Sequence, residues 1–131
     1  MFQPDFESMD RSSLAQLQLE RLCQTLDRIK NNNSFYFNKI NKLTSRDIHS
    51  LDDIKKFPFV TKDDLRDGYP YGYACADPSK FMRMHMSSGT TGTPIINPST
   101  RNDIRQWGNI MARCYCAAGL TDSDVIQITP S

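Results

Sequence analysis

Seven consecutive residues near the middle of the chain combine hydroxyl side chains with two glycines. They are Ser87, Ser88, Gly89, Thr90, Thr91, Gly92 and Thr93, and Pro94 follows them. The two glycines let the backbone turn sharply and approach a ligand closely. Consecutive backbone N–H groups in such a turn can converge on an anion, and the hydroxyls add further donors. A polyphosphate needs an array of this kind because its charge is spread over many oxygens. We therefore interpret residues 87–93 as a phosphate-binding loop, and we expect it to be exposed, to connect two antiparallel strands and to be mobile without nucleotide.

The loop differs from a Walker A sequence. That pattern requires G-x-x-x-x-G-K-[ST], whereas no lysine follows Gly92 and the next element is a short strand rather than a helix. A flexible Ser/Gly/Thr linker is the structural alternative. This loop is not repetitive, however, and it lies between an apolar strand and Pro94-Ile95-Ile96. Because both the Walker A lysine and the helix that follows it are missing, kinase-like and GTPase-like functions lose support.

His85 and Arg83 precede the loop on one face of a predicted strand. A lone histidine in a strand more often packs or forms a hydrogen bond than catalyses. Arg83 either adds positive charge near a phosphate or pairs with an aspartate. Cys114 and Cys116 form a C-x-C pair in a helical segment, where they point in different directions. We assign neither a catalytic residue nor a metal site to this chain.

The composition is that of an ordinary globular chain. Of the 131 residues, 38% are hydrophobic and 24% are charged, and the net charge is +1. This balance argues against a nucleic-acid binder. No stretch has the roughly 18 apolar residues of a membrane span. The first ten residues carry three carboxylates and no apolar run, which argues against a secretory signal. We expect a cytoplasmic protein that does not bind membranes, with its cysteines as free thiols.

Helical periodicity is clearest near the N-terminus. Residues 10–30 are predicted to form a helix whose apolar stripe contains Leu14, Leu17, Leu22, Leu26 and Ile29. The asparagines at 31–33 and Ser34 are expected to stop it. We expect Leu14, Leu17, Leu22 and Leu26 to face an apolar partner, either the aromatic residues 35–37 or a second chain.

Capping-box patterns predict several further helix starts. A threonine or serine stands three residues before an aspartate at Thr44–Asp47, Ser50–Asp53 and Thr61–Asp64. The second and third boxes predict short helices at Leu51–Lys56 and Lys62–Asp67. Residues Thr100-Arg101-Asn102-Asp103 open a longer helix, for which Gly119 is well placed as the C-terminal cap.

Three strands are predicted in the second half. Phe81–Met86 places its methionines on one face and Phe81, Arg83 and His85 on the other. Ile95 and Ile96 form a short strand closed by Asn97 and Pro98, and residues 124–129 form the last. The predicted fold class is α/β, with an α+β arrangement in this chain. A helical region at 1–67 precedes a strand–phosphate loop–strand–helix–strand unit at 68–131, which begins an ATP-binding domain.

The loop residues resemble the [ST]-[ST/SG]-G-[ST]-T-G-x-P signature of the adenylate-forming superfamily. Over most of the chain the sequence resembles phenylacetate–coenzyme A ligases in particular. The shared segments are residues 17–22, 52–59, 61–67, 84–94, 100–104 and 117–120. The resemblance implies that the chain is part of the large N-terminal domain of such an enzyme.

The resemblance also implies a two-step reaction. An aryl acetate attacks the α-phosphorus of ATP, which Mg²⁺ accompanies, to give an acyl adenylate and pyrophosphate. Coenzyme A then attacks the acyl carbonyl and expels AMP. The loop would orient the β- and γ-phosphates, a task in which positioning and electrostatics dominate. The resemblance suggests a homodimer for the intact enzyme.

Two departures from the family pattern matter. Many relatives have lysine after the second loop glycine, where this chain has Thr93. Family members are also several times longer, so later adenine-, acid- and coenzyme A-binding motifs are not in these 131 residues. We expect the chain alone to be inactive and to self-associate. The open alternatives are an adenylate-forming enzyme for another acid or acceptor, a non-catalytic nucleotide- or phosphate-binding module, and an interaction module.

Overall fold

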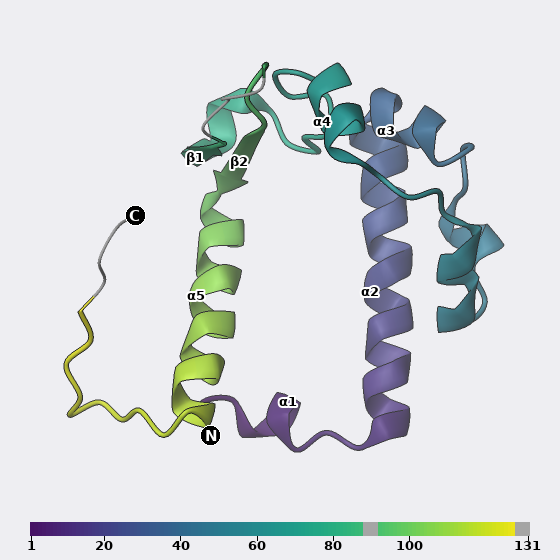
Figure 1. Cartoon of the computed structure of the whole chain (residues 1–131). Helices are drawn as coiled ribbons and strands as arrows, with labels where there is room; N and C mark the ends of the chain where they lie inside the picture. Colours follow the sequence, from purple (N-terminus) through teal and green to yellow (C-terminus); the bar gives the residue numbers. More distant parts are fainter. Residues whose placement is uncertain (88–91, 128–131) are drawn as a thin grey trace.

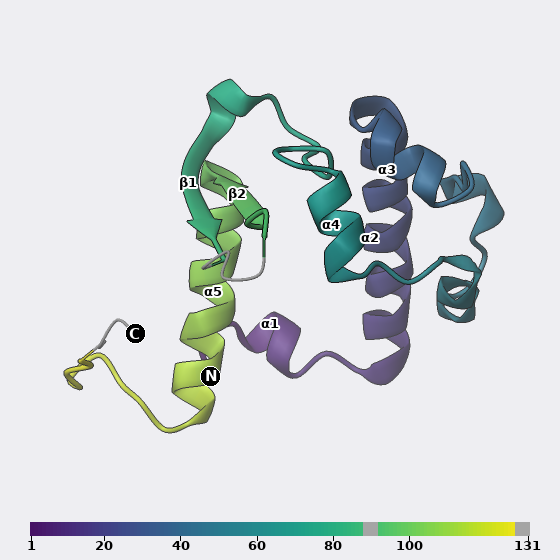
Figure 2. The ribbon, with the colours of Figure 1, turned by 45° about the horizontal axis from the view of Figure 1, so that its top comes forward.

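The computed structural model describes residues 1–87 and 92–127, and it mixes helices with one small sheet. The elements in chain order are α1 (Pro4–Glu7), α2 (Arg11–Asn32), α3 (Ser34–Lys39), η1 (Ser45–Asp47), η2 (Leu51–Lys56), α4 (Lys62–Asp67), η3 (Pro78–Lys80), β1 (Phe81–Met86), β2 (Ile96–Thr100) and α5 (Arg101–Ala117). The two long helices, α2 and α5, stand on opposite sides of the molecule (Figure 1). The two strands, α3 and α4 lie at one end of these helices, and α1 lies between them at the other end (Figure 2). The segment with η1 and η2 lies beside α2, on the side away from α5 (Figure 1).

Helix α2 begins and ends close to the predicted limits. The Asp10 side chain caps it by accepting hydrogen bonds from the backbone N–H groups of Ser12 and Ser13, each at 3.0 Å. The helix ends at Asn32. Asn33 then starts a new helix, because its side-chain oxygen accepts the Tyr36 N–H at 2.7 Å. The asparagine run therefore changes the direction of the chain while helical structure continues in α3.

Four buried aliphatic residues form the core. They are Leu26 and Ile29 from α2 together with Ile40 and Ile48 from the following segment. Leu19, Leu22, Cys23, Tyr36, Phe37, Phe57 and Cys75 pack around them. The prediction of an apolar partner is thus confirmed for Leu26, which lies in the cluster that Tyr36 and Phe37 pack against, and for Leu22, which packs against the same cluster. Leu14 and Leu17, nearer the start of α2, are half-buried.

All three predicted capping boxes are present, and a fourth begins α5 at Thr100. In each, the aspartate side chain accepts the backbone N–H of the threonine or serine, at 2.8–2.9 Å. Helices η2 and α4 have the predicted bounds, although η1 and η2 are 3₁₀ helices. Asp64 also pairs with Lys39, which fastens α4 to α3. Gly119, at φ +96°, follows α5 as expected for a C-terminal cap.

The turn after α4 packs against α3. Tyr73 places its ring 5.3 Å from the ring of Phe35 and 5.1 Å from that of Tyr36, measured between centroids. The Asn33 side-chain amide donates a hydrogen bond to the Ala74 carbonyl at 2.8 Å. A Cβ on Gly72 would meet the Gly68 backbone at 2.6 Å, so only glycine fits there. The predicted division into residues 1–67 and 68–131 stays a prediction.

Strands β1 and β2 pair antiparallel, with Phe81 opposite Thr100 and Met86 opposite Ile96. The predicted end of the second strand at Ile96 was wrong, because β2 continues through Asn97 and Pro98 to Thr100. Pro98 is tolerated because a two-stranded sheet leaves each strand one outer edge, where no N–H donor is needed.

The predicted last strand was also wrong over the part that can be compared. Residues 124–127 are not a strand, and Val125 is 98% exposed. Residues 128 and 129 lie outside the described ranges. An isolated strand has no partner for its backbone hydrogen bonds, so it is not stable by itself. Across residues 1–87 and 92–127, no helix has both the length and the apolar character that a bilayer crossing requires.

Truncation of the core tests whether α2 depends on it. Leu26 is only 2% exposed. We expect Leu26→Ala to lower the free energy of unfolding by about 2–5 kcal/mol, since the substitution removes buried methyl groups and leaves a cavity. Chemical denaturation followed by circular dichroism measures the change. Gln18→Ala, at an exposed position of the same helix, is the matched control. A loss at Leu26 no larger than that of the control would contradict this role for the core.

The capping aspartates predict acid sensitivity. The pKa of Asp64 is lowered to about 2, first by the Lys39 ammonium and then by the Thr61 hydrogen bonds. The pKa of Asp47 is lowered by the Thr44 hydroxyl and N–H, and that of Asp53 by the His49 N–H and the Lys56 ammonium. Because these folded-state pKa values lie below the unfolded value, the stabilisation is present above about pH 4. It is lost as pH falls toward the folded-state pKa values.

We therefore expect helicity to fall between about pH 4 and pH 2, measured by far-ultraviolet circular dichroism. Asp64→Asn should lower stability at neutral pH and make the remaining acid transition smaller. Asp122→Asn, at an exposed carboxylate of the C-terminal segment, should leave the transition unchanged. Identical acid transitions for Asp64→Asn and the unmodified chain would count against the capping role of Asp64.

Candidate functional site

The predicted phosphate-binding loop connects the two strands of the hairpin. Ser87 follows β1, and Ile96 begins β2. The predicted antiparallel arrangement of the two strands is confirmed. Of the seven predicted site residues, the structure describes Ser87, Gly92 and Thr93, and all three are exposed. Ser88, Gly89, Thr90 and Thr91 lie outside the described residues.

Ser87 and Ile95 close the base of the loop with two hydrogen bonds. The Ser87 N–H donates to the Ile95 carbonyl at 3.1 Å. The Ile95 N–H donates to the Ser87 Oγ at 2.9 Å. The Ser87 hydroxyl is therefore an acceptor within the hairpin, and its own proton remains available to an acceptor outside it.

Gly92 has a backbone conformation that strongly favours glycine. Its φ of +136° is one that L side chains rarely adopt, and the space where a Cβ would lie is open. The constraint at this position is therefore backbone conformation rather than lack of room. The positive φ at Gly92 therefore explains why a glycine occupies this position of the loop, four residues before β2 begins.

The hairpin is attached to α5, which follows β2 directly. The Thr100 side chain accepts the Asp103 N–H at 3.4 Å, and the Asp103 carboxylate accepts the Thr100 N–H at 2.8 Å. The His85 ring lies 5.5 Å from the Trp107 ring on α5. Arg83 lines a hollow beside the same helix. His85 therefore makes a ring contact with Trp107 while remaining exposed, and the predicted common face of Arg83 and His85 is confirmed.

The described residues contain no group of three or more His, Cys, Asp or Glu side chains that could hold a metal ion. The four cysteines are free thiols. The described residues of the hairpin offer backbone amides, hydroxyls, the Arg83 guanidinium and the His85 imidazole.

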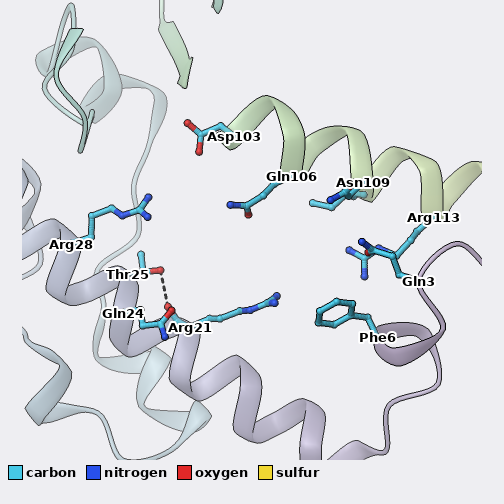
Figure 3. A pocket seen from close by; sticks show the side chains of 11 residues that line it. Gln3, Phe6, Arg21, Gln24, Thr25, Arg28, Asp103, Gln106, Asn109 and Arg113 are labelled. Atoms are coloured by element: carbon cyan, nitrogen blue, oxygen red, sulfur yellow. Dashed lines mark hydrogen bonds between the residues drawn. The ribbon is translucent and has the colours of Figure 1, made fainter. Parts of the chain in front are cut away.

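A larger hollow lies away from the loop, between α1, α2 and α5, with a volume of about 470 Å³. It is lined by Gln3, Phe6, Arg21, Gln24, Thr25, Arg28, Asp103, Gln106, Asn109, Ile110 and Arg113. Arg21 and Arg28 extend into it from α2, and Gln106, Asn109 and Arg113 lie on the α5 side (Figure 3). We call it the arginine pocket.

Positive charge dominates the arginine pocket. It is lined by three arginines but by one carboxylate, Asp103, which already caps α5. No described carboxylate forms an ion pair with Arg21, Arg28 or Arg113. Arg21 lies over the Phe6 ring, 5.6 Å from its centroid. Sequence reasoning missed this pocket because its two sides come from helices at opposite ends of the chain, which no local spacing reveals.

Comparisons with known proteins agree with the sequence resemblance, although no protein-family model matches the chain. A phenylacetate–coenzyme A ligase from Pseudomonas putida is 38% identical over 125 residues, which cover 94% of this chain and 28% of the relative. The corresponding enzyme from Escherichia coli (strain K12) is 39% identical over 124 residues, covering 93% of this chain and 28% of the relative.

Solved structures give the same result for the fold. A 2-hydroxyisobutyryl-CoA ligase in complex with 2-HIB-AMP and CoA, in its thioesterification state, superimposes with a TM-score of 0.84 at 29% identity. That match covers 92% of this chain and 27% of the solved chain. The open conformation of that ligase gives a TM-score of 0.79 at 27% identity.

The chain spans a little over a quarter of the length of the curated relatives it matches, at 28% of each. Nearly the whole of its sequence takes part in these matches. Nearly the whole of this chain is therefore similar, in sequence, to a little over a quarter of phenylacetate–coenzyme A ligases and, in fold, to the same share of a solved CoA ligase.

Proposed function

We propose that this chain is the ATP-phosphate-binding, N-terminal part of an AMP-forming aryl-acid–coenzyme A ligase. In the first step, the carboxylate of an aryl acetate attacks the α-phosphorus of MgATP, forming an acyl adenylate and releasing pyrophosphate. In the second step, the coenzyme A thiol attacks the acyl carbonyl, and AMP leaves. The chain by itself is inactive in this proposal, because the binding sites for adenine, the acid and coenzyme A lie in other parts of the ligase.

The observation that carries the proposal is the hairpin geometry in a chain similar to these ligases. Ser87 and Ile95 hold the two ends of a Ser/Thr/Gly loop together, and Gly92 turns its backbone. Residues 87–93 would present backbone N–H groups and hydroxyls to the β- and γ-phosphates. Such preorganised donors stabilise charge on the phosphates without reorganising during the reaction. Thr93 supplies a hydroxyl where a lysine would supply a full charge.

The acid is the least determined part of the proposal. Phenylacetate is favoured by the sequence relatives. The solved ligase with a similar fold instead carries 2-HIB-AMP, the adenylate of an aliphatic hydroxy acid. An adenylate-forming enzyme for a different acid is therefore the second candidate function. The same loop serves both, because the phosphates do not depend on which acid is activated.

The remaining parts of the proposal concern location and assembly. We place the reaction in the cytoplasm, where ATP and coenzyme A are available as diffusible substrates. For the intact ligase, a homodimer stays a prediction. A non-catalytic nucleotide-binding or interaction module is the alternative from another class, and it predicts phosphate binding or partner binding without pyrophosphate release.

A chimera tests the proposed activity directly. This chain would replace the matching segment of the Escherichia coli relative, and pyrophosphate release would be measured with ATP and a panel of aryl and aliphatic acids. We expect acid-dependent release by the chimera. In it, Thr91→Val should lower kcat/KM for ATP by about ten- to hundredfold, the typical value of a hydrogen bond to a charged group. Thr121→Val is the control outside the loop. A folded chimera that releases no pyrophosphate with any acid would refute the proposal.

A second prediction tests the base of the loop in the 131-residue chain. Ser87→Ala removes the acceptor of the Ile95 N–H. We expect hydrogen exchange of the Ile95 amide to accelerate by about two- to tenfold, the usual net value of one such bond. Nuclear magnetic resonance follows this amide individually. Ser99→Ala, which removes a hydroxyl from β2, should leave it unchanged. Equal exchange rates for Ser87→Ala and the unmodified chain would show that this hydroxyl does not close the loop.

A further inference from the structure

Two tyrosines of the turn after α4 contact different parts of the molecule. Tyr73 packs against two aromatic rings of α3. Tyr71, two residues earlier, contacts β1 instead. Its ring lies 5.2 Å from the ring of Phe81 in an edge-to-face arrangement, and its hydroxyl donates a hydrogen bond to the Met84 Sδ at 3.6 Å. The turn therefore connects the helical first half of the chain to the strand that leads into the phosphate-binding loop.

The turn that carries Tyr71 is itself held in place. The Ala74 N–H donates a hydrogen bond to the Tyr71 carbonyl at 2.9 Å. The Ala74 carbonyl in turn accepts a hydrogen bond from the Asn33 side chain at 2.8 Å. Asn33 is buried, and its side-chain oxygen also caps α3. The position of Tyr71 is therefore set by α3 and by the core on which α3 rests.

A β-bulge in β1 brings both contacts of Tyr71 to the same side of the strand. Phe81 and Met84 are three positions apart, so in a regular strand they would point to opposite faces. The pairing register shifts between them, because Phe81 is opposite Thr100 and Met84 is opposite Pro98. Three steps along β1 thus match two steps along β2, as in a β-bulge. Residues whose partners are two positions apart share a face, so one tyrosine contacts both.

The other face of β1 is held by α5. Next to Met84, His85 points to the opposite side of the strand, where its ring lies 5.5 Å from that of Trp107. Ser87 follows two residues later and closes the base of the loop through its N–H bond to the Ile95 carbonyl. From Met84 to Ser87 the chain covers three residues, or about 10 Å when extended. The end of β1 is therefore fixed on both faces shortly before the loop begins.

We propose that Tyr71 is a positioning residue for the phosphate-binding loop. It fixes β1 relative to α3 through Phe81 and Met84, so that the donors of the loop stand where the phosphates of ATP bind. This inference rests on the proposed function. Preorganised donors stabilise charge best, and a small misplacement of reacting groups lowers the rate. Loss of the Tyr71 ring therefore weakens the use of ATP and leaves the acid and coenzyme A steps unaffected.

Amide exchange in the 131-residue chain tests the coupling between Tyr71 and the loop. Tyr71→Ala should accelerate hydrogen exchange of the Ser87 amide by about two- to tenfold, the usual value of one aromatic pair. The Leu26 amide in the core should exchange at an unchanged rate, which shows that the fold is intact. Phe59→Ala, which removes an aromatic ring that is 95% exposed, is the matched control. Equal Ser87 exchange in Tyr71→Ala and the unmodified chain would overturn the proposal.

Kinetics of the chimera described above test the consequence for catalysis. Tyr71→Ala should lower kcat/KM for ATP in pyrophosphate release by about three- to tenfold. The KM for the acid, and the rate of thioester formation from preformed acyl adenylate and coenzyme A, should stay unchanged. Tyr71→Phe keeps the ring contact with Phe81 and should restore most of the ATP term. In a Phe81→Ala background Tyr71→Ala should have little further effect, because the shared contact is already lost.

The outcomes separate this inference from the proposed function. A general loss of folded enzyme would lower both steps in proportion, whereas positioning of the loop affects the ATP step alone. An active chimera in which Tyr71→Ala leaves ATP use unchanged, or lowers both steps equally, would overturn the inference and leave the proposed function standing. A folded chimera that releases no pyrophosphate with any acid would refute the proposed function, and the Ser87 exchange rates would then decide whether Tyr71 positions the loop.

Discussion

The first half of the structure depends on one buried apolar cluster, formed by Leu26, Ile29, Ile40 and Ile48. α2 supplies two of these residues, and the chain must return along α2 to supply the other two. α3 and the 3₁₀ helices that follow it make this return possible. Since few side chains are fully buried, each contributes a large share of the apolar stabilisation, and the short helices around the cluster rely on polar caps as well.

Aspartate capping is the second recurring device. Asp47, Asp53, Asp64 and Asp103 each accept the N–H of a serine or threonine three residues earlier. These bonds satisfy backbone donors that a short helix cannot pair internally. Asp64 does more, because its pairing with Lys39 links α4 to α3. The Tyr73 contacts with Phe35 and Tyr36 then connect the turn after α4 to the same helix.

The hairpin that holds the candidate phosphate loop is built differently. Among the described residues, its two strands form the whole sheet, with no further strand on either side. β1 lies beside α5, which it approaches through His85 and Arg83. Only the Ser87–Ile95 bonds and the Gly92 turn shape the described ends of the loop. A site of this kind depends on a rigid support beneath it, since phosphate binding is effective when the donors are already in position.

The sequence by itself determined the features that depend on near neighbours. Periodicity and side chains a few residues apart predict α2, the capping boxes at Thr44, Ser50 and Thr61, and the start of α5. They also predict the bounds of η2 and α4, β1 and the glycine cap after α5. The loop motif likewise indicated the adenylate-forming superfamily, and segments over most of the chain indicated a similarity to phenylacetate–coenzyme A ligases. These features could be predicted because their stabilising bonds join residues three or four positions apart.

Only the tertiary structure decided what depends on distant partners. Among the described residues, the backbone of Pro98 faces an open edge of the sheet, so a proline fits within β2. Residues 124–127 have no described strand to pair with, and they do not form one. The arginine pocket exists because α2 and α5 face it from opposite ends of the chain. Strand pairing and pockets are set by contacts between remote segments, so local residue patterns carry little information about them.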